Sequence, residues 1–429
     1  MKAPSRPSSL CIRSKSLVFL AWVMALGTTQ ALDAQGRTWI VDAQNRPGTH
    51  FLALSQINAS VKDGDTVLVR RGDYGEFTLD KAIALLCETG TRIVTQAFWG
   101  KTQLKGIGTG RTLRIRNLEF VTSLTSGTDA VQLLDSKGII VLDECRIVGS
   151  GQATGQLLPP EALLIRNCAA VTLDRSSCTL GTQVDQSRVV FSDCSLSGLN
   201  AAHIPTFPTP LWNDAAEGLL MRDSTVHLSQ CRTQGGNGDI VRGGALLAAR
   251  PGIRMIRSGL VLTGDGTSLV VAGKPPSTQT GNLPAILGDA SSQVLRDPAP
   301  ILTPTLGSRK ILGVGSEWAR PLPFLTAMHS ETTSITTVRT RGMTGEWSLL
   351  LLALPGLPTA IGDPGQLWLD PRQLWVMDVA RLATPPIRTV PIPIPNNSAL
   401  RGLGIAFQSL VGSTLGTMGL SSPTAIVLN

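Results

Sequence analysis

A short spacing of apolar residues recurs six times between Leu113 and Leu260. Each copy has apolar residues at its first and third positions, a small or apolar residue at its sixth position, and a fourth recurring position at its eighth. Spacers of unequal length separate the copies. The positions are Leu113, Ile115, Leu118 and Phe120; Ile140, Leu142, Cys145 and Ile147; Val171, Leu173, Ser176 and Cys178; Val189, Phe191, Cys194 and Leu196; Val226, Leu228, Cys231 and Thr233; and Ile253, Met255, Ser258 and Leu260. The period of two predicts strands with one inward face, and the two-residue gap predicts a tight bend between two short strands.

Neither strand of a copy can bury its apolar face alone, so the copies are expected to stack as successive coils of a solenoid, with the spacers extruded as loops. Amphipathic helices are the alternative, but the period of two and the abundance of Val, Ile, Thr and Ser oppose them. Polar pairs precede four copies, and in register they predict a structural ladder of turn residues. The pairs are Asp135-Ser136, Asn167-Cys168, Gln186-Ser187 and Asp223-Ser224.

The chain ahead of the repeat has the pattern of a first coil. Residues 63–74 read DGDTVLVRRGDY and residues 76–81 read EFTLDK. An amphipathic stretch with Phe51, Leu54 and Ile57 precedes them. Its resemblance to the corresponding stretch of parallel β-helix proteins implies a helix that covers the open end of the first coil, which otherwise exposes apolar surface and unpaired backbone groups.

With these motifs the chain resembles the right-handed parallel β-helix proteins of the pectin-lyase-like superfamily, over about residues 38–275. The resemblance implies an all-β fold class, a right-handed parallel β-helix solenoid. It implies little about activity, because one fold hosts many functions.

A second domain begins near Trp318. Gly and Pro turns separate short apolar segments without a helix period, so a small β-sandwich is expected after the solenoid. The expected strands are residues 335–339, 347–354, 367–369, 374–379, 403–408 and 424–428. Residues 365–371, 392–397, 403–408 and 420–423 resemble a C-terminal module of secreted bacterial proteins, which implies attachment or sorting.

These patterns divide the chain into four parts. The parts are a signal peptide at residues 1–34, a β-helix with an N-terminal capping helix at residues 35–275, an irregular final coil and linker at residues 276–317, and a β-sandwich module at residues 318–429. The third part loses the repeat and is interrupted by Pro and by Ser, Thr and Gln clusters.

The N-terminus has the pattern of a secretory signal peptide. Four basic residues precede an apolar core at residues 17–26, and a small-x-Ala site follows at residues 29–31. A buried N-terminal helix is the alternative. The signal-peptide pattern leads us to expect an extracellular or cell-surface protein. No other apolar run in the sequence reaches the ~18 residues of a membrane span. The net charge of +8 includes those four residues, and the other basic residues are scattered, which argues against nucleic-acid binding.

Six cysteines follow the N-terminal segment, an even number that suits an oxidising compartment. Cys145, Cys194 and Cys231 share one inward slot of the repeat, where a thiol acts as small apolar filler. Stacked neighbours such as Cys194 and Cys231 also approach disulfide distance if the intervening loop is extruded, so a bridge is the alternative to buried thiols. No Cys-x-x-Cys pair occurs, and no metal site is predicted.

The repeat places one group of ionisable residues at neighbouring bends. The residue after the second apolar position faces outward, and this column reads Arg116, Asp143, Asp174, Ser192, Ser229 and Ile256. The resulting candidate cluster is Asp143, Glu144, Asp174, Arg175 and Asp193. Lyases of this fold need calcium-binding carboxylates and a basic residue that abstracts a proton, and hydrolases need converging carboxylates. The cluster is thus a candidate calcium or uronate site, and the alternative is a bend that simply faces water.

A long spacer carries a second candidate group. His203, Trp212 and Asp214 lie within residues 198–218, which are too rich in Pro for regular structure. A Trp there suits stacking on a sugar ring and the His suits a base, so these residues are candidates for ligand binding. The alternative is a Trp that pins its loop to the scaffold.

No recognisable catalytic set accompanies the solenoid. The leading hypothesis is therefore a non-catalytic exported β-helix protein with an adhesive, glycan-contacting or structural role. Its expected partner is a polysaccharide or cell-surface glycan, and no nucleic acid, transmembrane segment or cofactor is expected. The alternative is a polysaccharide lyase or glycoside hydrolase acting on the outer face of the β-helix, with calcium only in the lyase. A purely structural spacer is the third hypothesis.

Overall fold

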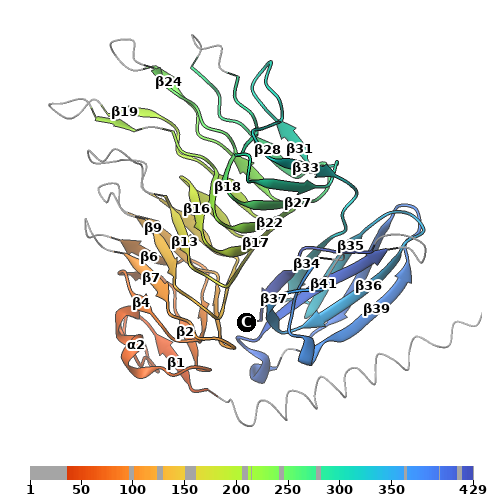
Figure 1. Cartoon of the computed structure of the whole chain (residues 1–429). Helices are drawn as coiled ribbons and strands as arrows, with labels where there is room; N and C mark the ends of the chain where they lie inside the picture. Colours follow the sequence, from red (N-terminus) through yellow and green to blue (C-terminus); the bar gives the residue numbers. More distant parts are fainter. Residues whose placement is uncertain are drawn as a thin grey trace, which may run out of the picture.

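The computed structural model has two parts, a parallel β-helix and a smaller antiparallel β-sandwich that lies beside it (Figure 1). This confirms the fold class predicted from the repeat. The structure describes residues 36–95, 101–122, 129–149, 161–204, 211–213, 215–240, 246–276, 282–361, 365–395, 397–412 and 418–428, with the backbone alone at 202–204, 211–213 and 246. The predicted signal peptide lies outside these residues. In the described part of the chain, no helix has the length and apolar character of a membrane crossing.

Each coil gives one strand to each of three parallel sheets, here called A, B and C, in that order along the chain. Sheet A consists of β1 (Thr38–Val41), β2 (Thr66–Val69), β5 (Ala84–Cys87), β8 (Thr112–Arg116), β11 (Ile139–Asp143), β14 (Ala170–Asp174), β17 (Arg188–Ser192), β22 (Thr225–Ser229), β27 (Gly259–Thr263), β30 (Gln293–Arg296) and β33 (Ser316–Ala319). Sheet B consists of β3 (Gly72–Tyr74), β6 (Thr91–Thr95), β9 (Glu119–Thr122), β12 (Arg146–Val148), β15 (Ser177–Thr179), β18 (Ser195–Ser197), β23 (Arg232–Gln234), β28 (Leu269–Val271) and β31 (Ile301–Thr303). Sheet C consists of β4 (Thr78–Leu79), β7 (Thr102–Lys105), β10 (Val131–Leu134), β13 (Leu163–Arg166), β16 (Thr182–Asp185), β21 (Leu219–Arg222), β26 (Ile253–Ile256), β29 (Ile286–Leu287) and β32 (Ile311–Leu312).

The inward positions of the repeat form one continuous core through the stack. Phe120 and Phe191 are fully buried, and Cys145, Cys194 and Cys231 are at most 3% exposed. All cysteines in the described residues are free thiols, so the inward cysteine column serves as apolar filler. The long spacers leave the stack between sheets B and C, where β19 (Ala202–Ile204) pairs with β20 (Leu211–Asn213) and β24 (Asp239–Ile240) with β25 (Leu246–Leu247).

Single residues with positive φ turn the chain between sheets. At the bend from A to B these residues are Asn117, Glu144, Arg175, Asp193 and Gln230, and at the bend from C to A they are Asp135, Asn167, Gln186, Asp223 and Arg257. The backbone ladder continues through the bend: the Glu144 amide donates to the Asp174 carbonyl at 3.0 Å, and the Arg175 amide to the Ser192 carbonyl at 2.9 Å. The hydrogen bonds between coils therefore offset the conformational free energy that this left-handed backbone requires.

The predicted polar ladder lies at the bend from C to A. The hydroxyl of each serine accepts from the backbone amide one coil earlier, at 3.0 Å for Cys168 to Ser187, 3.1 Å for Ser187 to Ser224 and 3.2 Å for Ser224 to Ser258. These serines are buried, so the bonds satisfy amides that water does not reach.

Two sequence predictions differ from the structure. The sixth copy of the repeat spans sheets C and A, with Met255 in β26 and Leu260 in β27, because both bends use the same spacing of apolar residues. The outward column therefore continues to Thr263 instead of Ile256. Residues 276–317 also are not an irregular linker, because β29 to β33 continue all three sheets. Strands of two residues, as in β29 and β32, are too short to show a period in sequence.

The expected N-terminal cap is a short helical segment, η1 (Leu54–Gln56) followed by α2 (Ile57–Ser60). Leu54 and Ile57 are fully buried, and with Val61 they join the core of the first coils.

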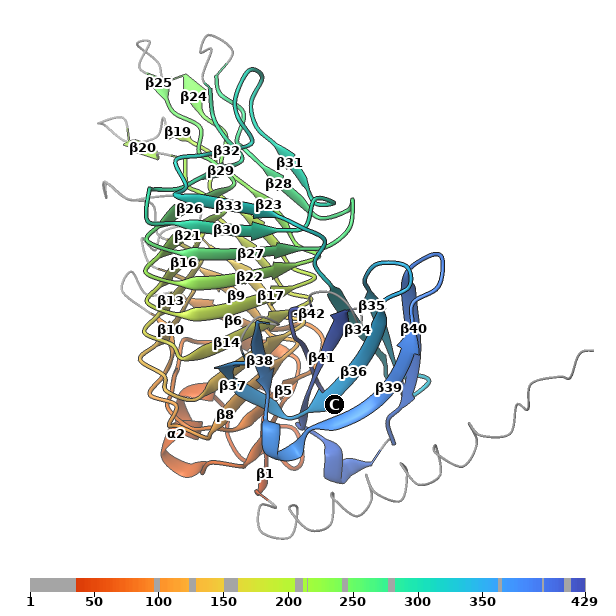
Figure 2. The same ribbon diagram turned by 45° about the vertical axis from the view of Figure 1, so that its right-hand side comes forward.

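The sandwich follows β33. Its strands and short helices are β34 (Phe324–Ser330), β35 (Ile335–Arg341), β36 (Trp347–Ala353), β37 (Pro355–Ala360), β38 (Gln366–Leu369), η2 (Pro371–Gln373), β39 (Trp375–Arg381), β40 (Ile387–Pro393), η3 (Ser398–Leu400), β41 (Gly404–Gly412), β42 (Met418–Leu420) and β43 (Thr424–Val427). One sheet has the order β34-β35-β40, the other has β39-β36-β41-β42 with β43 beside β41, and β37 pairs with β38. All six predicted strand segments are strands, and β34, β37, β40 and β42 were not predicted. Figure 2 shows the sandwich beside sheet A, along the earlier part of the stack.

The serine ladder gives a first prediction. In Ser224→Ala the amide of Ser187 loses its buried acceptor, and an unsatisfied buried amide costs about 1–3 kcal/mol. We expect the free energy of unfolding to fall by that amount, measured by urea denaturation. Ser195→Ala makes the same change at an exposed serine of β18 and leaves the midpoint unchanged. Equal losses in both variants would contradict the ladder.

Candidate functional site

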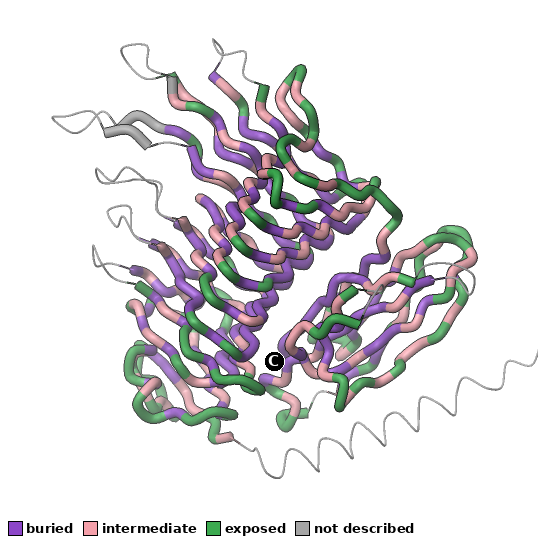
Figure 3. The backbone as a smooth tube through the Cα atoms, in the orientation of Figure 1, coloured by how far each residue is buried: buried purple, intermediate pink, exposed green. Residues whose placement is uncertain are grey.

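An outward column of polar residues on sheet A holds the last strand of the chain. The column has one residue in each of six coils, and it reads Arg116, Asp143, Asp174, Ser192, Ser229 and Thr263 in register. β43 crosses this column. Val427 forms hydrogen bonds with Arg116 and Asp143, and Thr424 forms one with Asp174. Figure 3 shows that the facing sides of the β-helix and the sandwich are buried.

Side chains of sheet A satisfy both backbone groups of Val427. Arg116 Nη1 donates to the Val427 carbonyl at 2.7 Å, and the Val427 amide donates to Asp143 Oδ2 at 2.9 Å. Thr424 Oγ1 donates to Asp174 Oδ1 at 3.1 Å. On the edge of β43 that does not pair with β41, the β-helix thus supplies hydrogen-bond partners for Val427.

Four carboxyl groups share two guanidinium groups at this contact. The guanidiniums belong to Arg116 and Arg175, and the carboxyls to Asp143, Glu144, Asp174 and Glu331. Glu331 comes from the sandwich, and its Oε1 lies 2.9 Å from Arg116 Nη2. Arg175 Nη1 lies 2.8 Å from Glu144 Oε1, and Arg175 Nη2 contacts Asp143. This set of six residues is called the latch cluster below, and its formal charge is negative.

Burial changes the titration of the latch cluster. The pKa of Asp143 is raised by desolvation, and the pKa of Asp174 is raised well above 3.8 by desolvation and by the charge of Asp143. Asp174 Oδ2 has no hydrogen-bond donor among the described residues, although Arg175 Nε lies 3.5 Å away. A carboxylate with this environment favours its protonated form.

These contacts change the interpretation of the first candidate group. Asp143, Glu144, Asp174 and Arg175 do lie together at the bend from A to B, but inside the contact with the sandwich. Neither an open calcium or uronate site nor a bend in water describes them, since Asp143 and Asp174 are at most 1% exposed. Asp193 lies one coil further along the stack, where it is exposed to solvent and is not covered by the sandwich.

The second candidate group is placed only in part. β19 and β20 form an antiparallel pair in which His203 lies opposite Trp212. The side chains of both residues, and all of Asp214, lie outside the described residues, so their proposed role in ligand binding stays a prediction. In the part of the chain that the structure describes, no group of three or more His, Cys, Asp or Glu side chains is arranged to hold a metal ion.

An apolar contact lies beside the latch cluster. Val141 and Val190 face outward from sheet A and are buried against Trp368 and neighbouring residues of the sandwich. The ring of Trp368 meets that of His227 edge to face at 5.8 Å, and burial lowers the pKa of His227 to about 4. Sequence reasoning missed this face, but β11 (Ile139–Asp143) is apolar on both sides, which is typical of a strand covered on both faces.

A pocket of about 880 Å³ lies where the sandwich leaves the first coils uncovered. Its β-helix wall includes Arg37, Lys62 and Arg114, and its sandwich wall includes Leu357 and Arg372. Both parts of the molecule are therefore needed to form the pocket. Concave sites with a few convergent polar groups between domains are the usual places for small ligands.

Arg114 is the unusual residue of this pocket. It points outward from β8 in the column that holds Val141 and Val190 in later coils. Its Nε is shielded from solvent and has no hydrogen-bond acceptor among the described residues, and desolvation lowers its pKa to about 10. A Cβ at Gly404 would lie 2.8 Å from this Nε, so a larger residue there would require the Arg114 side chain to move.

The acidic residues of the pocket are already engaged. Asp65 accepts from the Arg37 and Lys62 amides and from Trp39 Nε1, at 2.7 to 2.9 Å. Asp63 accepts from the Ala82 amide and pairs with Arg111 at 2.9 Å, and Asp370 accepts from the Arg372 amide. Within the described residues, no carboxylate pairs with the side chains of Arg37, Lys62, Arg114 or Arg372. The pocket therefore offers unpaired cations. Sequence reasoning missed it because its residues come from distant segments, and the one available signal was an Arg in an outward column without other residues charged at neutral pH, which reads Ala84, Arg114, Val141, Thr172 and Val190.

The latch cluster gives a second prediction. Asp143→Ala leaves Arg116 and Arg175 short of a buried partner and frees the Val427 amide, and breaking one side of a buried ion pair costs about 3–5 kcal/mol. We expect a large drop in the thermal midpoint and faster proteolysis within the sandwich. Asp193→Asn, at the exposed member of the predicted group, leaves both unchanged, because Asn also adopts the positive φ of this bend. Similar behaviour of the two variants would contradict the buried latch.

No protein-family model and no curated protein matches this sequence. Among solved structures, the fold is similar to the enzymatically active domain of bacteriophage CBA120 tailspike protein 2, with a TM-score of 0.34, 9% identity, and coverage of 84% of this chain and 72% of that chain. It is also similar to the full-length tailspike protein 2 of Escherichia coli O157:H7 bacteriophage CAB120, with a TM-score of 0.27 and 8% identity. That alignment covers 86% of this chain but only 60% of the tailspike. At these values the likeness carries no argument about activity, and the parallel β-helix followed by a β-sandwich rests on the strand topology itself.

Proposed function

We propose that this chain is an exported, non-catalytic β-helix protein that binds an acidic glycan in the pocket between its first coils and its sandwich. The observation that carries the proposal is Arg114, a desolvated guanidinium on the pocket wall whose Nε has no acceptor among the described residues. A ligand carboxylate would supply the acceptors, since guanidinium and carboxylate match in geometry as well as in charge.

The rest of the pocket supports the same ligand class. Arg37, Lys62 and Arg372 add positive charge, and within the described residues no carboxylate forms an ion pair with their side chains, while Asp63, Asp65 and Asp370 also line the pocket. Trp39 and Leu357 give the pocket an apolar wall, which suits the faces of sugar rings. A neutral or cationic ligand would leave the buried Nε of Arg114 without an acceptor, which is costly.

The other parts of the proposal rest on the sequence and on the contacts of the candidate residues. The N-terminal pattern of basic, apolar and small residues supports export. The carboxylates of Asp143 and Asp174, the strongest candidates for acid or base chemistry in the repeat, are occupied by β43. Binding without cleavage is therefore preferred over lyase or hydrolase activity at that cluster.

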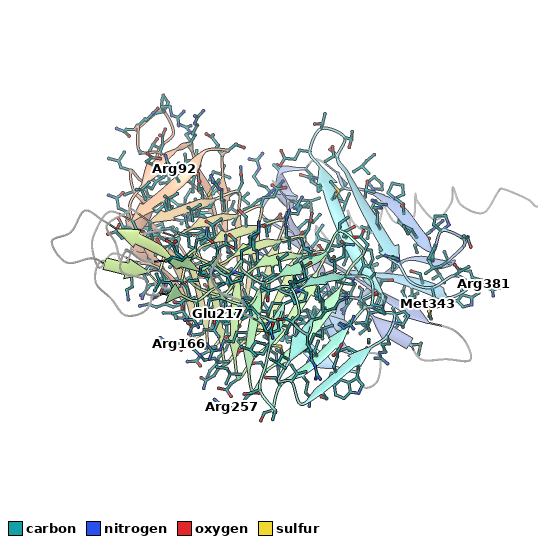
Figure 4. The ribbon with its side chains drawn as sticks, turned by 90° about the horizontal axis from the view of Figure 1, so that it is seen from above. Arg92, Arg166, Glu217, Arg257, Met343 and Arg381 are labelled. Atoms are coloured by element: carbon teal, nitrogen blue, oxygen red, sulfur yellow. The ribbon has the colours of Figure 1, made fainter. Side chains whose placement is uncertain are left out.

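One observation favours hydrolysis as a second candidate function. Asp129 and Glu161 directly precede β10 and β13 at equivalent positions of consecutive coils. Desolvation, with smaller effects of the Asp129 and Asp185 charges, raises the pKa of Glu161 to about 7, the range of a general acid in glycosidases. Glu217 lies at the same bend, before a later strand of sheet C. Figure 4 shows Glu217 on the β-helix, far from Met343 and Arg381 of the sandwich.

Arg114→Met tests the binding function, because it keeps a long apolar side chain and removes the charge. Loss of a charged hydrogen bond of about 1.5–3 kcal/mol weakens Kd about tenfold or more. The measurement is calorimetric titration with a uronate oligosaccharide and with its carboxyl-reduced, neutral counterpart, at low and high salt. Arg232→Met, at an exposed arginine of sheet B, is the control. Equal binding of both oligosaccharides, or no loss in Arg114→Met, would overturn the acidic-glycan proposal.

A separate assay addresses hydrolysis. The full chain is incubated with acidic and neutral polysaccharides, with and without calcium, and reducing and unsaturated ends are quantified. We expect none above background. Turnover that disappears in Glu161→Gln and persists in Asp193→Asn would replace binding by hydrolysis, with Glu161 as the general acid.

A further inference from the structure

The docking of the sandwich depends on a group of charges that do not balance. Four carboxyls face two guanidiniums in the latch cluster, and the two central carboxyls, Asp143 and Asp174, are removed from water. Uncompensated buried charge is costly, and a carboxyl in that position avoids the cost by taking up a proton.

Geometry singles out Asp174 as the proton holder. Each oxygen of Asp143 accepts a hydrogen bond, Oδ2 from the Val427 amide and Oδ1 from Arg175 Nη2, and Arg116 Nε lies 3.8 Å from Oδ2. Asp174 Oδ1 accepts from the Thr424 hydroxyl, whereas the buried Oδ2 has no hydrogen-bond donor among the described residues. A proton on Asp174 would leave the bond from Thr424 intact and remove one excess negative charge beside Asp143.

The same contact positions the sandwich wall of the pocket. β43 pairs with β41, and Gly404 at the start of β41 lies against Arg114. Release of β43 from the polar column would therefore also withdraw part of the pocket. Docking of the sandwich and the shape of the pocket are in this way one equilibrium.

We propose that Asp174 takes up a proton when the sandwich docks, so that acid tightens the contact between β43 and sheet A and alkali loosens it, together with the pocket. The effect on the pocket rests on the proposed function, whereas the latch itself does not. The raised pKa of Asp174 agrees with the direction. A carboxyl with a raised pKa in the docked state stabilises docking fully below 3.8, and this contribution is lost as the pH rises through the raised pKa.

Other groups that face Asp174 modify this response. On the β-helix they are Asp143, Glu144, Arg116 and Arg175, and from the sandwich Glu331 and His329 approach the same guanidiniums. The pKa of His329 is lowered by burial and then by Arg116, so His329 opposes docking as the pH falls through its ordinary value of 6.5. The contribution of Asp174 is therefore isolated by comparing variants rather than from the wild-type curve alone.

The test is hydrogen exchange of the β43 amides in the full chain without ligand, from pH 4.5 to 9. Protection of the Val427 amide reports on docking, because that amide donates to Asp143. Asp174→Asn keeps the shape of the protonated acid, and comparison with wild type at each pH cancels the chemical exchange rate. We expect wild-type protection to fall relative to Asp174→Asn by up to tenfold per pH unit above the raised pKa, since one proton is linked.

Two further variants make the result specific. Asp193→Asn, at the exposed bend one coil away, should follow wild type at every pH. His329→Gln should remove only the opposing change near pH 6.5. The proposal is overturned if Asp174→Asn and wild type show the same pH dependence, or if Asp174→Asn is less protected at pH 9. A failure to bind glycan leaves this measurement unaffected, so the two proposals fail separately.

Discussion

The stacking of parallel coils is the interaction on which the rest of the molecule depends. A single coil has strands of two to five residues and no core of its own, so each coil is stable only through its neighbours. Backbone ladders run through the sheets and through the positive-φ bends, and the serine hydroxyls cap buried amides between them. Because the register is fixed at every level, outward side chains also align, and a pattern repeated in sequence becomes a column on the surface.

Sheet A uses such columns to hold the sandwich. Outward apolar residues such as Val141 and Val190 supply the burial, and the polar column two residues further along each strand supplies partners for β43. A sandwich held only by apolar contact could slide along the stack, whereas hydrogen bonds to both backbone groups of Val427 fix its position. The buried carboxyls of Asp143 and Asp174 satisfy polar groups of β43 that water does not reach.

The pocket arises where the sandwich stops short of complete coverage. Turns of the first coils and the loops of the sandwich surround Arg114, whose neighbours in the column are covered by apolar side chains. The site proposed for a glycan and the latch that positions its wall are consequently parts of the same interface. The proposed function therefore belongs to the junction of the two parts rather than to the repeat itself.

The sequence alone determined the coils, their inward residues, the thiol column and the sandwich, because local period and turn chemistry specify these features. It also brought Asp143, Glu144, Asp174 and Arg175 together, since neighbours in the repeat become neighbours in space. It did not determine the continuation through residues 276–317, where the strands are too short to show a period. Tertiary structure alone decided that the charged bend is covered and that Arg37, Arg114 and Arg372 line one pocket. The packing of the sandwich on sheet A brings together residues about 300 positions apart, and no local pattern encodes such a contact.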